Sequence, residues 1–594
     1  MQPENTHTVT VPYEGGEERR GPVTMGQANM IRCILRDDPA QINIHDVWSA
    51  PPGIRLDTAI DALRVLVIRH EALRTTFPRR SGAAPCEQVV SAEGEFTVTV
   101  LDLDELPAEP GPYAEALANR ARAERFVLEK EFALRISLVT LAGSPVLAVV
   151  VASHAVADGS ALAVLREEWL TLLAGETLPP LTALTPLDLA ADEATPAGLR
   201  KSRASLGYWE QIIRTGPQAM FAEPRATGVD VRLPQLTLRS RRGARALALV
   251  AERTGSLPST VLLTAWCALV AHRAGQSTCV VAVPTSNRFQ SRLARSVNTM
   301  SQDALLSLDV RAPSFDALLR RAWGAALNAY RHSQFDAVSL WEMIDRATFE
   351  RGSHFARDVV FNDVSTLPSV LTAAGTEDDA GPDLELRRGP AQVLPTRALV
   401  FVYRTAPLLH LSLWADPALF PREEAEGFLG GLVRLLEAAG AEDVPFAVLT
   451  EVTGVHPAER GAHWRQVDGS WISPPAVADA LSRALDGLPV HVTLDVPPAD
   501  TPSGDIPSGA APPGATPPEG DAGQYLTAFV ASGGSPLTPA RAHAALMDVL
   551  PGRPGVLAPH RYVIVQDPPT GTDRTSAWLR QQILMEGTGR ERPM

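Results

Sequence analysis

The chain has 594 residues, of which 45% are hydrophobic and 21% charged, and a formal net charge of −14. A wholly disordered chain is excluded, because such chains carry too little apolar surface to offset the entropy of ordering. The acidic excess argues against binding the phosphate backbone of a nucleic acid. The four cysteines lack a CxxC spacing, and no run of about 18 apolar residues occurs. We therefore expect no zinc site, no membrane partner and a cytoplasmic location.

The first part of the chain alternates between helical and strand-like patterns, which is typical of the α/β class. Residues 1–21 carry acids and glycines without a sustained period, and they predict a flexible leader. The elements that follow are predicted, in chain order, as a helix at 54–70, a strand at 96–100 and a buried strand at 146–151. Residues 22–180 should thus form a first unit, and the Pro-, Leu- and Thr-rich residues 181–200 a connection.

The same alternation continues in a second predicted unit over residues 201–445. Its predicted elements are helices at 257–274, 315–332 and 422–439 and strands at 279–283, 359–361 and 408–414. Residues 446–460 are predicted to be a linker to a smaller α+β domain over 461–594. Within that domain, the Pro, Gly, Ala, Ser and Asp content of residues 497–523 predicts a disordered insert.

The buried strand predicted at 146–151 runs into Ser153-His154-Ala155-Val156-Ala157-Asp158-Gly159, ahead of a predicted helix. A histidine in such a loop is held by the sheet and exposed at its edge, where catalytic groups of α/β proteins often lie. A structural role is the alternative, with His154 as an ordinary loop residue and Asp158 as the N-cap of the helix. The heptapeptide alone leaves both interpretations open.

A serine nucleophile at Ser153 is disfavoured. Adjacent residues of an extended chain point to opposite sides, so the Ser153 hydroxyl and the His154 ring should not meet. No G-x-S-x-G elbow surrounds the serine either.

Six segments, in the same order, resemble the condensation domains of nonribosomal peptide synthetases and their acyltransferase relatives. Residues 153–159 resemble the HHxxxDG signature, with Ser153 in place of the first histidine. The other segments are Pro22–Ala28, similar to an opening PLSxxQ; Arg69–Phe77, similar to RHExLRTxF; Tyr208-Trp209, similar to a YW pair; Pro284–Arg288, similar to a segment ending in a structural arginine; and Val297-Asn298-Thr299, similar to FVNT. The resemblance spans about residues 22–440.

This resemblance implies a pseudo-dimer of two chloramphenicol-acetyltransferase-like halves with a central tunnel, in which two phosphopantetheine-bound substrates meet. It implies that His154 is the catalytic residue, which accepts a proton from the attacking nucleophile, or orients it and stabilises the tetrahedral intermediate. Asn298 and Asn362 are candidates for the tunnel wall.

The resemblance also assigns supporting roles within the motif. Asp158 is implied to pair with Arg288 and fix the loop, and Gly159 to let the backbone approach closely. Ser153 is the departure from the family pattern, although a serine can still hydrogen-bond a neighbouring backbone group. Ser153, Asp158, Gly159 and Arg288 are therefore expected to support the motif.

The implied reaction needs no tightly bound cofactor and no metal, because the phosphopantetheine thioester of the substrate supplies the activated acyl group. The expected partners are an acyl or peptidyl carrier protein and a small-molecule amine or alcohol. The expected protein is a free-standing condensation enzyme of specialised-metabolite biosynthesis that forms an amide or, as a second choice, an ester. The alternatives are a non-catalytic carrier-binding scaffold and an acyl-CoA-dependent O-acyltransferase.

The last unit has a resemblance of its own. Residues 464–477 resemble the segment after the hinge of adenylate-forming enzymes, and residues 560–574 resemble their closing segment, with Thr572 where that family carries a catalytic lysine. The only lysines of the chain are Lys130 and Lys201. The large nucleotide-binding subdomain of that family has no counterpart either, so a docking or stabilising platform is expected here.

Overall fold

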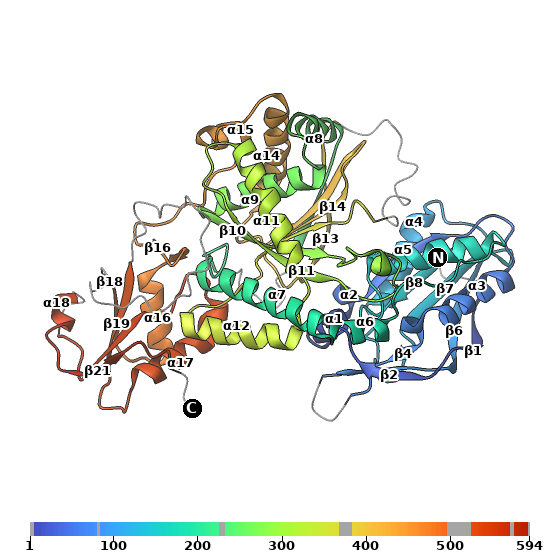
Figure 1. The fold of residues 1–594 in the computed structure, drawn as a ribbon. Helices are drawn as coiled ribbons and strands as arrows, with labels where there is room; N and C mark the ends of the chain where they lie inside the picture. Colours follow the sequence, from blue (N-terminus) through green and yellow to red (C-terminus); the bar gives the residue numbers. More distant parts are fainter. Residues whose placement is uncertain are drawn as a thin grey trace.

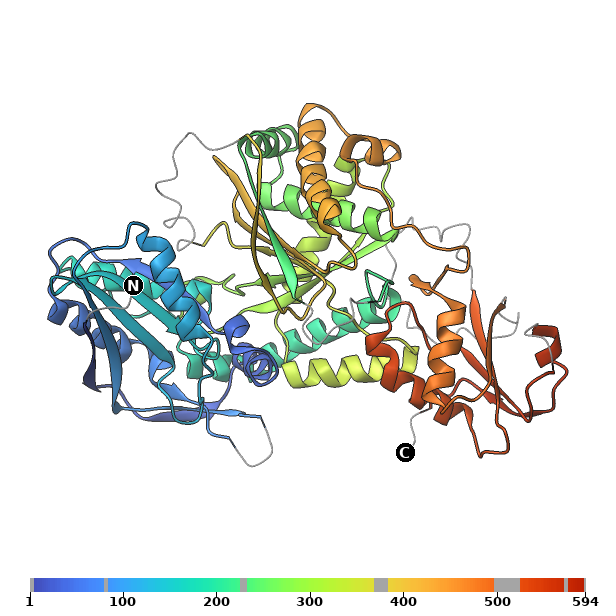
Figure 2. The same ribbon diagram turned by 180° about the vertical axis from the view of Figure 1, so that it is seen from behind.

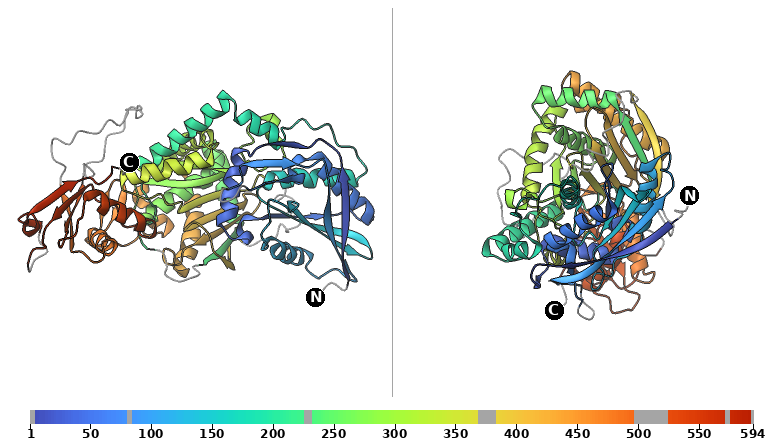
Figure 3. Two further views of the ribbon diagram at one scale, coloured as in Figure 1. Left: turned by 90° about the horizontal axis from the view of Figure 1, so that it is seen from below. Right: turned by 90° about the vertical axis from the view of Figure 1, so that its right-hand side faces the viewer.

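The computed structural model describes residues 5–79, 84–224, 232–367, 383–495, 524–570 and 575–591. Three units lie in a row, and the middle one contacts both others (Figures 1 and 2). We call them the N-terminal half, the C-terminal half and the C-terminal domain. The view from below in Figure 3 shows the same order, with the C-terminal domain and the N-terminal half at opposite ends.

The N-terminal half is built on a five-stranded sheet of order β1-β6-β7-β8-β3, in which only β6 and β7 are parallel. Helices α3 and α5 pack on one face and α4 on the other. The main strands are β1 (Asn5–Glu14), β3 (Ile44–Ser49), β6 (Glu93–Leu103), β7 (Leu134–Leu141) and β8 (Ser144–Ala152), and the helices are α1 (Met25–Arg36), α2 (Pro39–Ile42), α3 (Leu56–Arg69), η1 (Glu71–Arg74), α4 (Pro110–Arg122) and α5 (Gly159–Leu173). A small sheet adds β2 (Arg19–Pro22), β4 (Thr75–Thr76) and β5 (Glu87–Val90).

The prediction of a flexible leader over residues 1–21 is wrong for residues 5–14 and 19–21, which form strands. Residues 5–14 form β1, which pairs along its whole length with β6, and β2 begins at Arg19. Val11 and Tyr13 are buried, while threonines occupy the alternate, outward positions. Threonine is β-branched and fits a pleated surface, so polar-looking residues here form a strand. Residues 1–4 lie outside the described part of the chain.

The C-terminal half is built on a seven-stranded sheet of order β11-β10-β12-β14-β15-β9-β13. The strand β12 is parallel to β10 and β14, and the other pairs are antiparallel. Helices α8, α9, α11 and α14 pack against it and bury a large core of leucine, valine and alanine. The bounds are α7 (Pro196–Thr215), β9 (Leu233–Ser240), α8 (Arg241–Thr254), α9 (Pro258–Ala274), β10 (Thr278–Thr285), α10 (Ser291–Ala294), β11 (Gln302–Asp309), α11 (Phe315–Arg331), α12 (Ala337–Arg351), β12 (Val359–Asp363), β13 (Glu385–Gln392), β14 (Ala398–Arg404), β15 (Leu409–Ala415), α14 (Arg422–Ala441), η2 (Phe446–Val448) and α15 (Leu449–Thr453).

Two stretches predicted as connections contain helices. Within residues 181–200 lie α6 (Pro186–Glu193) and the start of α7. Each helix begins with a threonine N-cap, Thr185 or Thr195, followed by proline at the first helical position. These two residues favour the start of a helix, and a helix forms here although the sequence lacks a sustained hydrophobic period. Within residues 446–460, α15 anchors Leu449 in the core of the C-terminal half.

The C-terminal domain has the predicted small α+β form. Its sheet has the order β18-β19-β20-β21, and helices α16 and α17 bury one of its faces. The bounds are β16 (Arg465–Val467), β17 (Ser470–Ile472), α16 (Pro474–Ala484), β18 (Val490–Asp495), β19 (Tyr525–Ala531), α17 (Pro539–Val549), η3 (Leu550–Gly552), β20 (Arg561–Val565), α18 (Thr575–Trp578) and β21 (Ile583–Gly587). The predicted insert 497–523 and Thr572 lie outside the described residues.

Gln218 docks the C-terminal domain on the C-terminal half. Its side chain is buried, and Nε2 donates to the carbonyl oxygens of Pro554 at 2.9 Å and Val556 at 2.7 Å. Its backbone N–H donates to Ser470 Oγ at 3.0 Å. The two units are therefore joined by buried, directional hydrogen bonds.

We expect Gln218→Ala to destabilise the protein by about 1–3 kcal/mol, because two buried carbonyl oxygens lose their donor. Urea denaturation measures the loss. The matched control is Gln211→Ala on α7, whose side chain is exposed. Equal unfolding free energies for the two variants would contradict this docking role.

Among the described residues, no single helix has both the length and the apolar character that a membrane span requires. Helices α8 and α9, which are bent by 104° relative to each other, meet those requirements of length and composition only as a pair.

Candidate active site

His154 lies in the loop that joins the end of β8 to the start of α5. Its Nδ1 is 2.9 Å from the carbonyl oxygen of Ala157 and 3.3 Å from Oγ1 of Thr299. A carbonyl oxygen only accepts, so Nδ1 carries the proton and the lone pair of the neutral ring lies on Nε2. In the described part of the chain, Nε2 has no hydrogen-bond partner. The ring is thus prepared to accept a proton at Nε2.

Burial lowers the pKa of His154 below its ordinary value, because the charged imidazolium is poorly solvated there. The negative charge of Asp158 and the Ala157 carbonyl oppose this effect without overcoming it. The imidazole is therefore neutral at neutral pH.

Asp158 ties the motif to the other half of the molecule. Its Oδ2 accepts from Arg288 Nη1 at 2.7 Å and from the backbone N–H of Met300 at 3.0 Å, and its Oδ1 accepts from the backbone N–H of Ala161 at 3.0 Å. The exposed fractions of the Asp158 and Arg288 side chains are 2% and 6%. The expected ion pair is present, and Asp158 is also the N-cap of α5.

Arg288 belongs to the connection between β10 and β11, residues 286–301, which we call the bridging loop. Its Nη2 donates to the carbonyl oxygens of Ser296 at 3.1 Å and Asn298 at 3.0 Å. One guanidinium therefore folds the bridging loop on itself and holds it against the motif. Sequence analysis named Arg288 but missed the parts played by Thr299 and Met300; the FVNT-like segment was the signal that could have drawn attention to Thr299.

Ser153 is completely buried. Its backbone N–H donates to Ala133 at 3.0 Å, and its Oγ accepts from the backbone N–H of Ala155 at 3.4 Å. No hydrogen bond joins it to His154 among the described residues. Gly159 begins α5, where an added Cβ would lie 3.1 Å from Cδ1 of Leu367, so any larger residue would press on that side chain.

We expect Ser153→His to cost about 1–3 kcal/mol of stability, because the ring must enter a fully packed site. Thermal unfolding and acyl-transfer rates, measured beside Ser153→Ala, report the effect. Undiminished stability with equal or higher activity would show instead that the site still accommodates the histidine.

The two candidate asparagines lie in different parts of the C-terminal half, Asn298 in the bridging loop and Asn362 on β12. Asn298 is buried, and its Oδ1 accepts from the backbone N–H of Thr299 at 2.8 Å. Its Nδ2 is also buried, and no described residue forms a hydrogen bond with it. Asn362 is half-buried on β12, where it pairs across the sheet with Phe401 of β14. No hydrogen bond joins Asn362 to the motif among the described residues. The structure thus brings His154, Asp158, Arg288 and Asn298 together and leaves Asn362 on the sheet.

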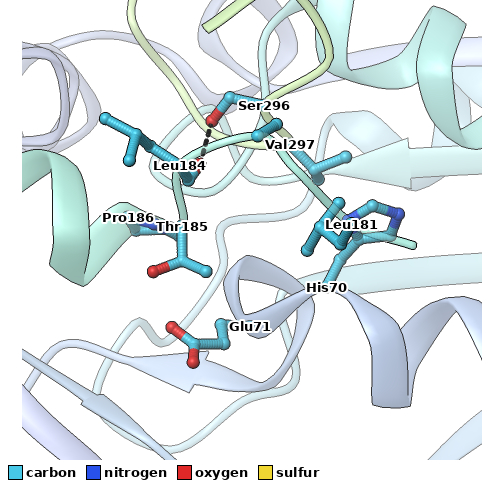
Figure 4. A pocket seen from close by; sticks show the side chains of 9 residues that line it. His70, Glu71, Leu181, Leu184, Thr185, Pro186, Ser296 and Val297 are labelled. Atoms are coloured by element: carbon cyan, nitrogen blue, oxygen red, sulfur yellow. Dashed lines mark hydrogen bonds between the residues drawn. The ribbon is translucent and has the colours of Figure 1, made fainter. Parts of the chain in front are cut away.

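A small, partly open pocket lies where the segment before α6 crosses the bridging loop (Figure 4). It is lined by His70, Glu71, Leu181, Ala183, Leu184, Thr185, Pro186, Ser296 and Val297. Ser296 Oγ donates to the carbonyl oxygen of Leu184 at 2.7 Å. His154 is not among the lining residues, so this pocket is a junction between segments rather than the reaction site. No group of three or more metal-ligating side chains occurs within the described ranges.

The acid side of the pH–rate profile should follow His154. If neutral His154 is required, protonation at Nε2 abolishes activity, so turnover falls as the pH drops through the pKa of the ring. Because burial lowers that pKa, we expect the midpoint of kcat below about 6.5, the ordinary value for histidine. Values of kcat measured across the pH range with one pair of carriers give this midpoint. A midpoint above the ordinary value would contradict the burial argument.

Comparison with known proteins shows the family to which the chain belongs. The condensation-domain model matches residues 31–442. Tyrocidine synthase 3 of Brevibacillus parabrevis is 25% identical over 436 residues, which are 70% of this chain and 6% of that protein. Phosphinothricin tripeptide synthetase PhsC of Streptomyces viridochromogenes is 32% identical over 254 residues, or 39% of this chain and 22% of that protein. The chain therefore spans a small part of the length of these relatives.

Solved structures agree on the fold. The SgcC5 protein from Streptomyces globisporus has a TM-score of 0.56 at 22% identity and covers 72% of this chain and 100% of its own. The first condensation domain of the CDA synthetase has a TM-score of 0.56 at 19% identity and covers 73% of this chain and 98% of its own. The α/β fold with two chloramphenicol-acetyltransferase-like halves is thus the condensation-domain fold, and the family match covers well over half of the sequence. The chain belongs to the condensation-domain family.

Proposed function

We propose that the protein forms an amide bond between an acyl group held as a carrier-protein thioester and an amine acceptor, in specialised-metabolite biosynthesis. The observation that carries this proposal is the state of His154: a neutral ring with its lone pair on Nε2, in a loop that the Asp158–Arg288 pair fixes to both halves. The names of the relatives, which include a tripeptide synthetase, agree with this kind of chemistry.

His154 handles the single proton of this reaction. The acceptor nitrogen attacks the thioester carbonyl carbon, and a C–N bond forms as the C–S bond breaks. The proton that the nitrogen gives up is taken or oriented at Nε2 of His154 and ends on the departing phosphopantetheine sulfur. The substrate thus supplies the activation, and we assign no tightly bound cofactor and no metal to the step. A central tunnel between the halves is the proposed route for both substrates.

A non-catalytic, carrier-binding role is the second candidate, and Ser153 favours it. The first motif position, next to His154, holds a fully buried serine in place of the histidine of the family signature. A fold neighbour at 17% identity was solved as a complex of an X-domain with OxyB, so this fold also occurs bound to another protein. Carrier binding without product formation is the signature of this alternative.

For the C-terminal domain we propose a docking or stabilising role. An adenylating domain brings a cation to the carboxylate and the α-phosphate as negative charge develops there. No lysine follows Lys201 in the sequence. The buried hydrogen bonds of Gln218 instead support a domain held in place on the C-terminal half.

Intact-mass analysis of acyl-loaded carrier proteins tests the function. Carriers from the neighbouring biosynthetic genes are incubated with candidate amines or amine-loaded carriers, with and without the protein. The proposal predicts deacylation of the donor carrier and an equal gain of acyl mass on the acceptor. Carrier binding without any mass change would support the scaffold instead.

A further inference from the structure

A buried carboxylate joins the two halves at a second point, ten residues after Asp158. Glu168 lies on α5, and its side chain is 3% exposed. Its Oε2 accepts from His70 Nε2 at 2.7 Å and from Arg69 Nε at 3.1 Å. Its Oε1 accepts from Arg295 Nη2 at 3.4 Å. Arg295 comes from the bridging loop of the C-terminal half, so Glu168 connects three segments that are distant in sequence.

The partners of Glu168 keep it ionised. Burial alone would raise the pKa of this carboxyl, but the hydrogen bonds from His70 and Arg295 and the charges of His70 and Arg69 outweigh it and hold the pKa below its usual value. An ionised, buried carboxylate with three donors is costly to disturb from one side. Figure 4 shows His70 of the N-terminal half and Ser296 of the bridging loop around the same small pocket.

The bridging loop is thus attached to α5 at two places. Arg288 binds Asp158 at the first turn of the helix, and Arg295 binds Glu168 more than two turns later. Beyond the second attachment, the loop delivers Thr299 Oγ1 to within 3.3 Å of His154 Nδ1. The position of that hydroxyl against the imidazole therefore depends on both attachments.

We propose that Arg295 and Glu168 are positioning residues for His154, and this rests on the amide-forming function proposed above. The pair holds the bridging loop against α5, so that Thr299 meets the imidazole and the backbone N–H of Met300 meets Asp158. Neither residue touches substrate in this role. Loss of the Arg295–Glu168 contact lets the bridging loop shift. Small displacements of groups that position a catalytic side chain slow the reaction strongly.

The neighbouring Glu167 provides a discriminating variant. It also binds Arg295, at 2.8 Å, but its side chain is 63% exposed. Exposed ion pairs contribute little to stability because water solvates both charges. The buried carboxylate of Glu168 cannot be solvated by water, so it depends on its protein partners. Glu167→Gln should therefore change little, and Glu168→Gln should change much. Arg295→Gln removes the contacts of Arg295 with Glu167 and Glu168 but leaves His70 and Arg69 on Glu168. It therefore tests the contact between the halves even if Glu168→Gln folds poorly.

Two readouts on the full chain test the proposal. In the transfer assay, Arg295→Gln and Glu168→Gln should lower kcat by about 10- to 100-fold with the KM for the carriers unchanged, and Arg295→Lys should recover part of the loss. In hydrogen exchange, the peptide containing Met300 should exchange about 10-fold faster or more in both variants, with β19 of the C-terminal domain unaffected. Glu167→Gln should stay within twofold of the wild type in both.

The exchange measurement separates this proposal from the function on which it rests. If the wild type transfers no acyl group, the proposed function fails, but exchange at Met300 still reports whether the pair holds the loop. Wild-type exchange there in Arg295→Gln overturns the positioning role. An equal effect of Glu167→Gln overturns it too, because the buried carboxylate would then not be the anchor.

Discussion

Replacing His154 by alanine is expected to lower turnover by about 10²–10⁴-fold, the usual contribution of a positioned general base, with the fold intact. The methyl group cannot hold a proton between the acceptor nitrogen and the departing sulfur. The site would keep Asp158, Arg288 and their hydrogen bonds, since none of them passes through the ring. Acyl-transfer rates under saturating carriers measure the loss, and circular dichroism checks the fold.

The matched control for this prediction is His463→Ala. His463 is exposed and lies between the C-terminal half and β16, so its loss should leave turnover unchanged. A folded His154→Ala protein with wild-type turnover would remove the imidazole from the mechanism.

Replacing Asp158 by alanine is expected to act through stability, at a cost of about 3–5 kcal/mol. The substitution leaves the buried Arg288 guanidinium without its charge partner, and it removes both the acceptor for Met300 and the N-cap of α5. Urea denaturation measures the change in unfolding free energy.

An ion pair of the same bridging loop supplies the control for Asp158. Asp192 pairs with Arg292, and the exposed fractions of their side chains are 40% and 44%. Asp192→Ala should therefore cost less than about 1 kcal/mol. An unfolding free energy of Asp158→Ala equal to that of the control would contradict the structural role of the motif aspartate.

Regular apolar periods were sufficient to predict many of the elements. The helix predicted at 54–70 is α3, whose apolar residues recur at helical spacing on one face. The apolar run at 146–151 lies inside β8, and such a short continuous run is typical of a buried strand. The strand β1 was missed because its apolar alternation is short: Val9, Val11 and Tyr13 alternate with exposed residues, but Asn5 and His7 occupy the earlier positions on the same face. Helix α6 was missed because it is short and depends on its cap.

The contacts of the candidate active site were harder to predict from sequence patterns. The Asp158–Arg288 pair spans 130 residues, and no local pattern links them; only the resemblance to a family suggested it. Glu168 stands beside Glu167 on α5, and such a pair of acids resembles a solvated helix face in sequence. Its burial follows from the packing of α3 and the bridging loop, which is a tertiary property. Side chains that act across the two halves therefore escape sequence patterns.

Single-turnover transfer from an acyl-loaded carrier to an amine, with carrier binding measured on the same samples, tests the catalytic role of this protein most directly. The wild type should convert bound donor to amide, whereas His154→Ala should bind the carrier with the same Kd and form product at least 100-fold more slowly. Equal rates in the two proteins, or binding without product in both, would contradict catalysis by His154.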